Sequence, residues 1–110
     1  MRESFGNSFA RARTHSEGTG ELYLLSGEKM SMRGWDYAGE QPEKEWESHD
    51  YEVMGFVIDG SSQLHFEDGM QELEAGDAYH VPPNTRHKFN ITGYFRCVEV
   101  TAPPTFDGPS

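Results

Sequence analysis

Acidic side chains and one histidine directly precede the most apolar run of the chain. The segment reads EWESHDYEVMGFVIDG over residues 45–60 and closes on a glycine. Glu47 and His49 are two residues apart, so in an extended strand both side chains would point to one side. Carboxylates and imidazoles are ligands of divalent transition metals, and the segment therefore raises the question of whether this protein holds a metal.

The elements that must position these side chains are short β-strands. From residue 21 onward, β-prone or alternating segments are separated by Gly, Asp, Asn and Pro at close intervals, and none shows helical periodicity. Asp68 and Gly69 predict a hairpin turn, and Pro42 disfavours a strand in the polar segment 38–45. About seven or eight short strands predict an all-β jelly roll or small barrel, because closure removes exposed sheet edges.

The segment YEVMGFVIDG, residues 51–60, would be apolar on both faces. One face would carry Val53, Gly55 and Val57, and the other would carry Met54, Phe56 and Ile58. A strand that is apolar on both sides must be covered by the domain core and by something else, which is either a second layer or a subunit interface. We therefore expect a homodimer.

Two motifs give the chain a resemblance to the cupins, whose signatures can be written G-x5-H-x-H-x3,4-E-x6-G and G-x5-P-x-G-x2-H-x3-N. The segment GDAYHVPPNTRHKFN matches the second signature, with Pro82 and His87 on its proline and histidine. Asn84 replaces the middle glycine, which is a mild change because asparagine tolerates a left-handed backbone. The final asparagine comes one residue early, at Asn90. The resemblance implies the double-stranded β-helix of this family, a jelly-roll barrel.

The first signature is matched less well. If Gly60 is its final glycine, its two histidines correspond to Glu47 and His49 and its glutamate to Val53, so two of the usual four ligands are changed. With His87, the resemblance implies a ligand set of Glu47, His49 and His87. Two imidazoles and one carboxylate suit a divalent transition metal, with iron first and manganese, nickel or zinc as alternatives.

Three other polar residues are weaker candidates. Glu52 is a secondary metal ligand, because in a regular strand it points away from His49 and would need a bulge to reach the metal. His80 and Glu99 could lie on the inner wall, with a register that the sequence leaves open. For His87 itself the alternative is a side chain that caps the preceding turn, and for Glu47 it is a solvated carboxylate.

Two functions follow from the resemblance. The first is a small metallocupin that acts on a small organic molecule by oxygenase-, isomerase- or lyase-type chemistry, with catalytic residues still unassigned. The second is a metal-free cupin that binds a small ligand, such as a sugar or an organic acid, in a sensory or auxiliary role. Val53 would then make the pocket hydrophobic, with His49 and His87 as polar handles.

Composition excludes several partners. A chain of 110 residues fits one domain, and its formal charge of -10, from 19 acidic against 9 basic residues, would repel a nucleic acid backbone. No apolar run approaches membrane length. The lone Cys97 lies in an apolar stretch and is expected to be a small buried hydrophobe. These features predict a cytoplasmic protein that contacts neither nucleic acid nor membrane.

Three segments are expected along the chain. Residues 1–20 mix small, polar and charged residues without a period, which predicts a mobile N-terminal arm, with a short helix that docks on a partner subunit as the alternative. Residues 21–103 would form the barrel. Residues 104–110 would form a Pro-rich tail with little left to pack.

Overall fold

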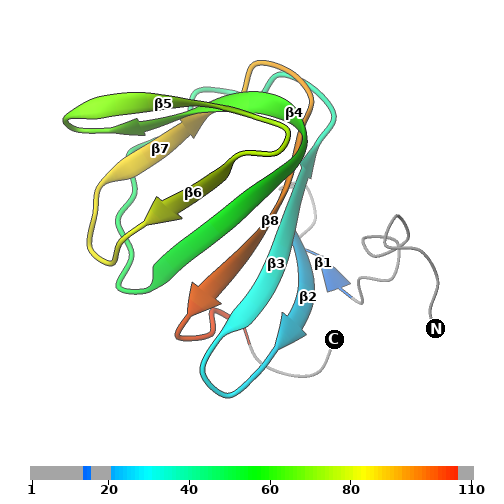
Figure 1. The fold of residues 1–110 in the computed structure, drawn as a ribbon, viewed down its shortest axis with the longest axis vertical. Helices are drawn as coiled ribbons and strands as arrows, with labels where there is room; N and C mark the ends of the chain where they lie inside the picture. Colours follow the sequence, from blue (N-terminus) through cyan, green and yellow to red (C-terminus); the bar gives the residue numbers. More distant parts are fainter. Residues whose placement is uncertain (1–13, 16–20, 107–110) are drawn as a thin grey trace.

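The structure, a computed structural model, describes residues 14–15 and 21–106, and every regular element in those ranges is a β-strand (Figure 1). The strands are β1 (Thr14–His15), β2 (Glu21–Ser26), β3 (Ser31–Tyr37), β4 (Glu52–Phe66), β5 (Gly69–Glu74), β6 (Ala78–Val81), β7 (His87–Asn90) and β8 (Phe95–Ala102). The predicted all-β fold class is confirmed.

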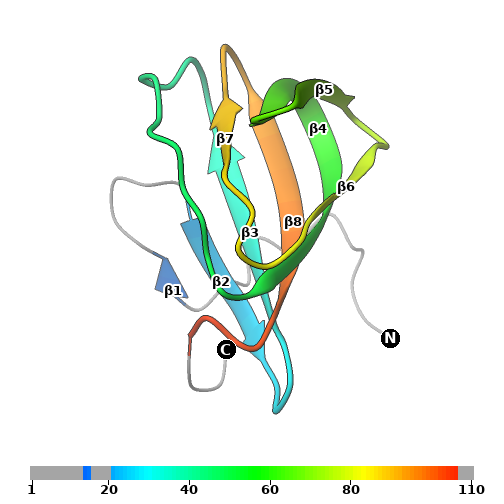
Figure 2. The same ribbon diagram turned by 90° about the vertical axis from the view of Figure 1, so that its left-hand side faces the viewer.

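Two antiparallel sheets share strand β4 (Figures 1 and 2). The first sheet has the strand order β1-β2-β3-β8-β4-β6, and in the second sheet β4 pairs with β5 and β7. Because β4 leaves one sheet and enters the other, the two sheets face each other and enclose a core. This arrangement is the jelly-roll barrel that the sequence predicted.

The corner between the sheets lies at Gly60. The apolar segment 51–60 closes on this glycine, but β4 continues through it from Glu52 to Phe66. A shift of register after Val57 bends the strand, and Gly60 has a φ of 79°. A Cβ atom at this position would collide with the backbone of Tyr94. Glycine is therefore required for the bend, because other residues disfavour a positive φ and have no space here.

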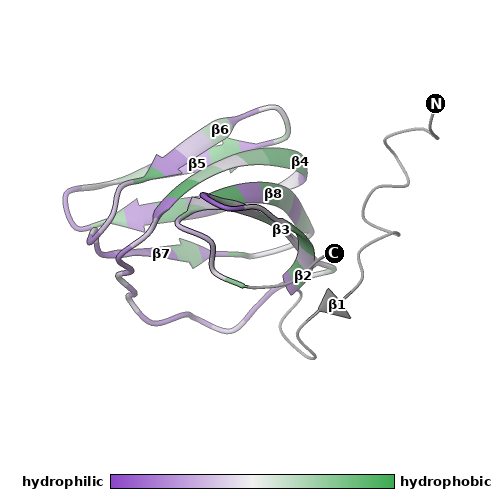
Figure 3. Ribbon diagram, turned by 90° about the horizontal axis from the view of Figure 1, so that it is seen from below, coloured by the Kyte–Doolittle hydropathy of each residue, from purple (hydrophilic) through white to green (hydrophobic). Residues whose placement is uncertain are grey.

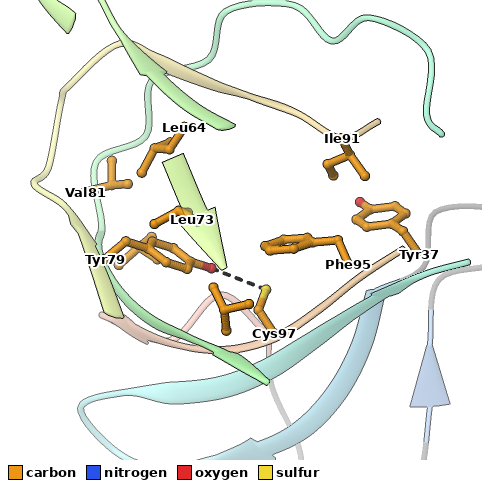
Figure 4. Packing of buried hydrophobic residues seen from close by; sticks show 10 residues of the cluster. Tyr37, Leu64, Leu73, Tyr79, Val81, Ile91, Phe95 and Cys97 are labelled. Atoms are coloured by element: carbon orange, nitrogen blue, oxygen red, sulfur yellow. Dashed lines mark hydrogen bonds between the residues drawn. The ribbon is translucent and has the colours of Figure 1, made fainter. Parts of the chain in front are cut away.

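Side chains from both sheets meet in one hydrophobic core (Figure 4). Its buried members, all on strands except Ile91, are Tyr37, Val53, Val57, Leu64, Leu73, Tyr79, Val81, Ile91, Phe95 and Cys97. The predicted alternation in β4 is confirmed, since Val53 and Val57 are buried while Met54 and Phe56 are exposed. The predicted burial of Cys97 is also confirmed.

Both ends of the described chain contact the barrel. Thr14–His15, within the predicted arm, forms β1 and pairs with β2, while residues 1–13 and 16–20 lie outside the described residues. The described part of the tail packs on the barrel, since the Phe106 and Tyr23 rings lie 4.6 Å apart. Thr105 also donates its backbone N–H to the Ser31 hydroxyl at 3.0 Å. The barrel contacts therefore extend beyond residue 103.

Candidate metal site

Glu47 and His49 lie on an extended segment that runs beside β7 (Figure 2). The sequence placed them on a strand, but only an isolated bridge forms here: the N–H groups of Glu47 and His87 donate to each other's carbonyl oxygens at 2.9 Å. The Asn84 N–H donates to the His49 carbonyl at 2.6 Å. Residues directly opposite in an antiparallel pair bring their side chains together on one face, so the bridge places Glu47 next to His87.

The turn before β7 has the backbone that the sequence predicted. Asn84 has a φ of 59°, the left-handed conformation that asparagine tolerates better than most residues. The same residue anchors the loop that carries His49. Asn84 therefore adopts the left-handed conformation expected of the glycine in the family signature. The turn leads into β7, which begins at His87.

Glu47, His49 and His87 converge. Each offers one ligand atom, and these atoms all lie within 4.8 Å of one another. The His49 Nε2 lies 2.9 Å from Glu47 Oε1, and the two imidazole rings are 5.8 Å apart. Among residues 14–15 and 21–106, this is the one group of three or more His, Cys, Asp or Glu residues with such spacing. Exposure falls across the group, because Glu47 is exposed, His49 is half-buried and His87 is buried.

Neighbouring groups hold both imidazoles in place. The Nδ1 atom of His87 lies 2.8 Å from the Thr85 carbonyl oxygen. Because that oxygen can only accept, Nδ1 carries the proton and Nε2 is left with the lone pair that a metal would need. The ring of His49 stacks on the ring of Tyr51, with centroids 4.7 Å apart and an interplanar angle of 9°.

This donor set fits a transition metal. Neutral imidazole nitrogen and carboxylate oxygen are ligands of iron, manganese, nickel and zinc. The residue at the fourth ligand position of the family pattern is Val53, which is buried and also lines the cavity. A metal held here would therefore have three protein ligands, and the remaining coordination positions would be open to small molecules.

The three side chains lie on the wall of a cavity of about 400 Å³. Apolar and aromatic side chains dominate the remaining lining, among them Trp35, Tyr37, Phe89, Ile91 and Phe95. The rings of Trp35 and Tyr37 are stacked 5.9 Å apart. A cavity of this size and lining suits a small molecule with an apolar part, with the Glu47–His49–His87 group as its polar handle.

A second polar cluster lines the same cavity. Glu99 is 3% exposed and accepts three hydrogen bonds: from Arg33 Nε at 2.9 Å, from Trp35 Nε1 at 3.0 Å and from the Tyr79 hydroxyl at 2.5 Å. Burial and the Glu99 carboxylate raise the pKa of Tyr79 well above its usual range. Burial by itself would lower the pKa of Arg33, but Glu99, Tyr51 and Glu21 together raise it above its usual value, so the guanidinium stays charged.

The remaining predicted site residues divide between the two sides of the sheet. Glu99 lines the cavity, as the sequence suggested. Glu52 and His80 instead form an exposed pair, with Oε2 and Nε2 2.6 Å apart. The bulge in β4 comes after Val57, too late to turn Glu52 inward. The structure therefore does not bring Glu52 or His80 to the Glu47–His49–His87 group.

Sequence reasoning missed Arg33 and Tyr51. Arg33 pairs with Glu99, and its guanidinium carbon also lies 5.6 Å from the Tyr51 ring centroid. The alternation of β3 held a usable signal, because Arg33 and Trp35 share a face with Tyr37 and oppose the apolar Met32. An arginine on the aromatic face of a strand predicts a buried carboxylate partner, since a buried charge must be paired.

Comparisons with known proteins agree with this architecture. A family model described as "Cupin domain" matches residues 35–101. A search of curated proteins finds no match. The described part of the chain contains no helix long and apolar enough to span a bilayer.

Several solved structures share the fold. An RmlC-like cupin from Shewanella frigidimarina NCIMB 400 superposes with a TM-score of 0.73 at 18% identity, covering 91% of this chain and 88% of that one. KdgF from Halomonas sp. gives 0.70 at 15% identity, covering 81% and 85%. A Ralstonia eutropha JMP134 protein, provisionally named a mannose-6-phosphate isomerase, gives 0.69 at 21% identity, covering 91% and 98%. Identities this low establish a shared fold alone.

Proposed function

The chain belongs to the cupin family, and from this premise we propose that Glu47, His49 and His87 bind a divalent transition metal, with iron favoured over manganese, nickel and zinc. The metal would serve a reaction on a small organic molecule, of the oxygenase, isomerase or lyase type. The observation that carries the proposal is the convergence of three ligand atoms within 4.8 Å. The His87 hydrogen bond to Thr85 supports it, because that bond leaves Nε2 available.

The side chains of the cavity would position the substrate and exclude water during such a reaction. A bound metal supplies Lewis-acid or oxygen-activating chemistry at its open positions. The apolar walls, including Phe89 and Ile91, would bind the carbon skeleton of the substrate and displace water. The backbone bridge between Glu47 and His87 would keep two ligands in register while a substrate enters and leaves.

Elemental analysis of purified, untagged protein tests the proposal. We expect close to one metal ion per chain in the wild type, lost in a Glu47→Ala, His87→Ala double variant prepared in the same way. The matched control is a Glu52→Ala, His80→Ala double variant. It removes the same two residue types from a pair that lies 2.6 Å apart on the outside of the barrel.

The outcomes separate the possibilities. Metal retained in the control and lost in the site variant supports the proposal and justifies oxygen-uptake, isomerase and lyase screens. Equal loss in both variants would show that the bound ion is not specific to this site. Absence of metal from the wild type, even after incubation with each of the four ions, would overturn the proposal.

A second candidate function is a metal-free module that binds a small ligand. The observation that favours it is Val53, which places an apolar side chain at a ligand position of the family pattern. The test is thermal unfolding in the presence of a chelator, with a panel of sugar phosphates, sugars and organic acids. The panel begins with sugar phosphates because of the name of the Ralstonia neighbour. A stabilising shift that is lost in His49→Ala would support this function, since binding to the native state raises stability.

We also propose that the protein works in the cytoplasm. Its lone cysteine, Cys97, is free and fully buried, so nothing in the described fold depends on a disulfide. Fractionation of cells that express the full-length chain would test this placement. Recovery of the protein in a membrane or secreted fraction would contradict it.

A further inference from the structure

Among the described residues, one cation on the cavity wall has no carboxylate partner. The basic side chains that line the cavity are those of Arg33, Lys44 and Lys88. The Arg33 Nε atom lies 2.9 Å from a Glu99 oxygen, and the Lys88 Nζ atom lies 3.3 Å from a Glu43 oxygen. Lys44 is half-buried and makes no ion pair within the described part of the chain.

Lys44 is held against the inner wall of the barrel. Its Nζ atom lies 5.1 Å from the centroid of the Tyr37 ring, and Tyr37 is buried on β3. The segment that carries Lys44 is fixed on both sides, because the Gln41 N–H donates to the Ile91 carbonyl at 2.9 Å and Glu47 forms the backbone bridge. An aromatic ring attracts an ammonium group without neutralising it, so the charge of Lys44 remains available to an anion.

Lys44 and the candidate metal site lie within reach of one small molecule. Lys44 comes three residues before Glu47, and three residues of extended chain span at most about 11 Å. The same cavity is also lined by Val53 of β4 and Phe95 of β8, two strands whose apolar colouring is visible in Figure 3. A molecule in this cavity can therefore place a charged end on Lys44 and an apolar body on these walls.

The lining of the cavity differs in charge from the molecule as a whole. Its three basic side chains are balanced by three carboxylates, those of Glu45, Glu47 and Glu99. The whole chain has 19 acidic against 9 basic residues. The chain as a whole thus repels an anion, whereas the cavity does not. A divalent metal at the candidate site would make the cavity net positive and attract an anion further.

The available donor suits a carboxylate better than a phosphate. Phosphate groups are commonly bound by the fork of an arginine or by the N-terminus of a helix. The described ranges contain no helix, and the arginine of the cavity already pairs with Glu99. A lysine ammonium is a single point charge, which the single charge of a carboxylate matches. A carboxylate would also meet less repulsion than a phosphate from Glu45 and Glu47 on the same wall.

We propose that the cavity binds a small organic carboxylate, with the anionic group on Lys44 and the apolar body against side chains such as Tyr37 and Phe89. The inference rests on the proposed function, because it names the class of molecule on which the metal would act. Lys44 would determine specificity by selecting molecules that carry a negative charge.

NMR titration of the full chain tests the proposal with matched pairs of probes. The probes are hexanoate and 3-phenylpropionate, each compared with its primary amide, which keeps the shape and removes the charge. The titrations contain a chelator, so that the acid cannot bind through a metal ion. We expect each acid to bind about 10-fold or more tightly than its amide, the effect of a hydrogen bond to a charged group.

Two lysine variants locate the anion. Lys44→Met keeps much of the length of the side chain but removes its charge, and it is expected to bring acid and amide to within about twofold of each other. The matched control is Lys29→Met, since Lys29 is an exposed lysine between β2 and β3, and this variant is expected to keep the preference. The spectra also show whether each variant is folded. Hexyl phosphate is expected to bind no more tightly than hexanoate.

A wild type without a preference for either acid would overturn the proposal, and so would a Lys44→Met variant that keeps the preference. Tighter binding of hexyl phosphate than of hexanoate would overturn the assignment to carboxylates. Metal content, measured without chelator on the same preparations, separates this inference from the proposed function. Bound metal without a preference for acids rejects the inference alone, whereas a Lys44-dependent preference without bound metal supports the inference and rejects the metal.

Discussion

Two carboxylates line the same cavity, and their surroundings differ. Glu99 lies on β8 between two other strands, is 3% exposed and accepts hydrogen bonds from Arg33, Trp35 and Tyr79. Glu47 lies on an extended segment, its side chain is 56% exposed, and its carboxylate contacts His49. One carboxylate accepts three hydrogen bonds from protein side chains, while the other has more oxygen lone pairs left for a ligand.

The contrast shows how one cavity can hold a structural and a functional carboxylate. A buried charge persists only when it is paired and hydrogen-bonded, and a carboxylate with most of its acceptor sites filled has little left for a ligand. The Glu99 cluster therefore fixes the inner wall of the barrel. The Glu47–His49–His87 group is left free to bind. Substitutions in the first cluster are expected to change stability, and substitutions in the second to change metal affinity.

Glu99→Ala is the most severe test of this contrast. The substitution leaves the Arg33 guanidinium buried without its main partner, and we expect a loss of about 3–5 kcal/mol in the free energy of unfolding. Urea denaturation measures the change. Leu73→Ala, which removes a buried apolar side chain instead, serves as the reference for loss of packing alone. A Glu99→Ala loss below 1 kcal/mol would contradict the structural role of the cluster.

Glu47→Gln tests the role of the second carboxylate as a metal ligand. The amide keeps the shape but loses the charge of the metal ligand, and we expect metal affinity to fall about 10- to 100-fold. Because the side chain is largely exposed, the unfolding free energy of the metal-free protein is expected to change by about 0.5 kcal/mol or less. Calorimetric titration and urea denaturation give the two values. A large loss of stability with unchanged affinity would reverse the assigned roles.

Tyr79→Phe measures what one hydrogen bond contributes to the stability of the Glu99 cluster. The variant removes the hydroxyl that donates to Glu99 at 2.5 Å, and it retains the buried ring. We expect a loss of about 1.5–3 kcal/mol, the usual range for a hydrogen bond to a charged group. Tyr94→Phe is the control, since Tyr94 is 41% exposed. Equal effects in the two variants would argue against a special role for the Tyr79–Glu99 bond.

Ionisation of Cys97 is expected to change stability least at neutral pH. Burial raises the pKa of the Cys97 thiol to about 12 from a usual value of 9.0, with Glu99 as a second cause. The stabilisation from the neutral thiol is therefore present below about pH 9 and lost as pH rises from 9 to 12, because the unfolded thiol ionises first. At pH 8 we expect thiol reagents to label the folded protein at least about 100-fold more slowly than the urea-unfolded chain. Comparable rates would show that the Cys97 thiol on β8 is accessible to the reagent in the folded protein.

The sequence was informative wherever local pattern and backbone chemistry decide structure. Alternation in residues 51–60 predicted which side chains of β4 face inward, because successive residues of a strand must point to opposite faces. Asn84 was recognised as a residue for a left-handed turn, and its φ of 59° agrees. The resemblance of the second signature identified His87, and the resemblance of the first identified Glu47 and His49.

The sequence was uninformative wherever register or long-range pairing decides. It did not show that β4 bends at Gly60 and continues to Phe66, because a local glycine signal does not distinguish a corner from an end. It left Glu52 and His80 open, and only the pairing of β4 with β6 showed that they meet on the outside. Arg33 and Glu99, 66 residues apart, met only through the pairing of β3 with β8.

The sequence by itself thus determined the family, the all-β class and the three side chains of the candidate metal site. Strand periodicity, turn residues and motif spacing are local properties that can be read along the chain. Tertiary structure alone decided that Glu47 lies opposite His87 and that Glu99 accepts hydrogen bonds from three side chains. These features depend on which strands pair and in what register, and that choice is made by the burial of the whole core rather than by any single segment.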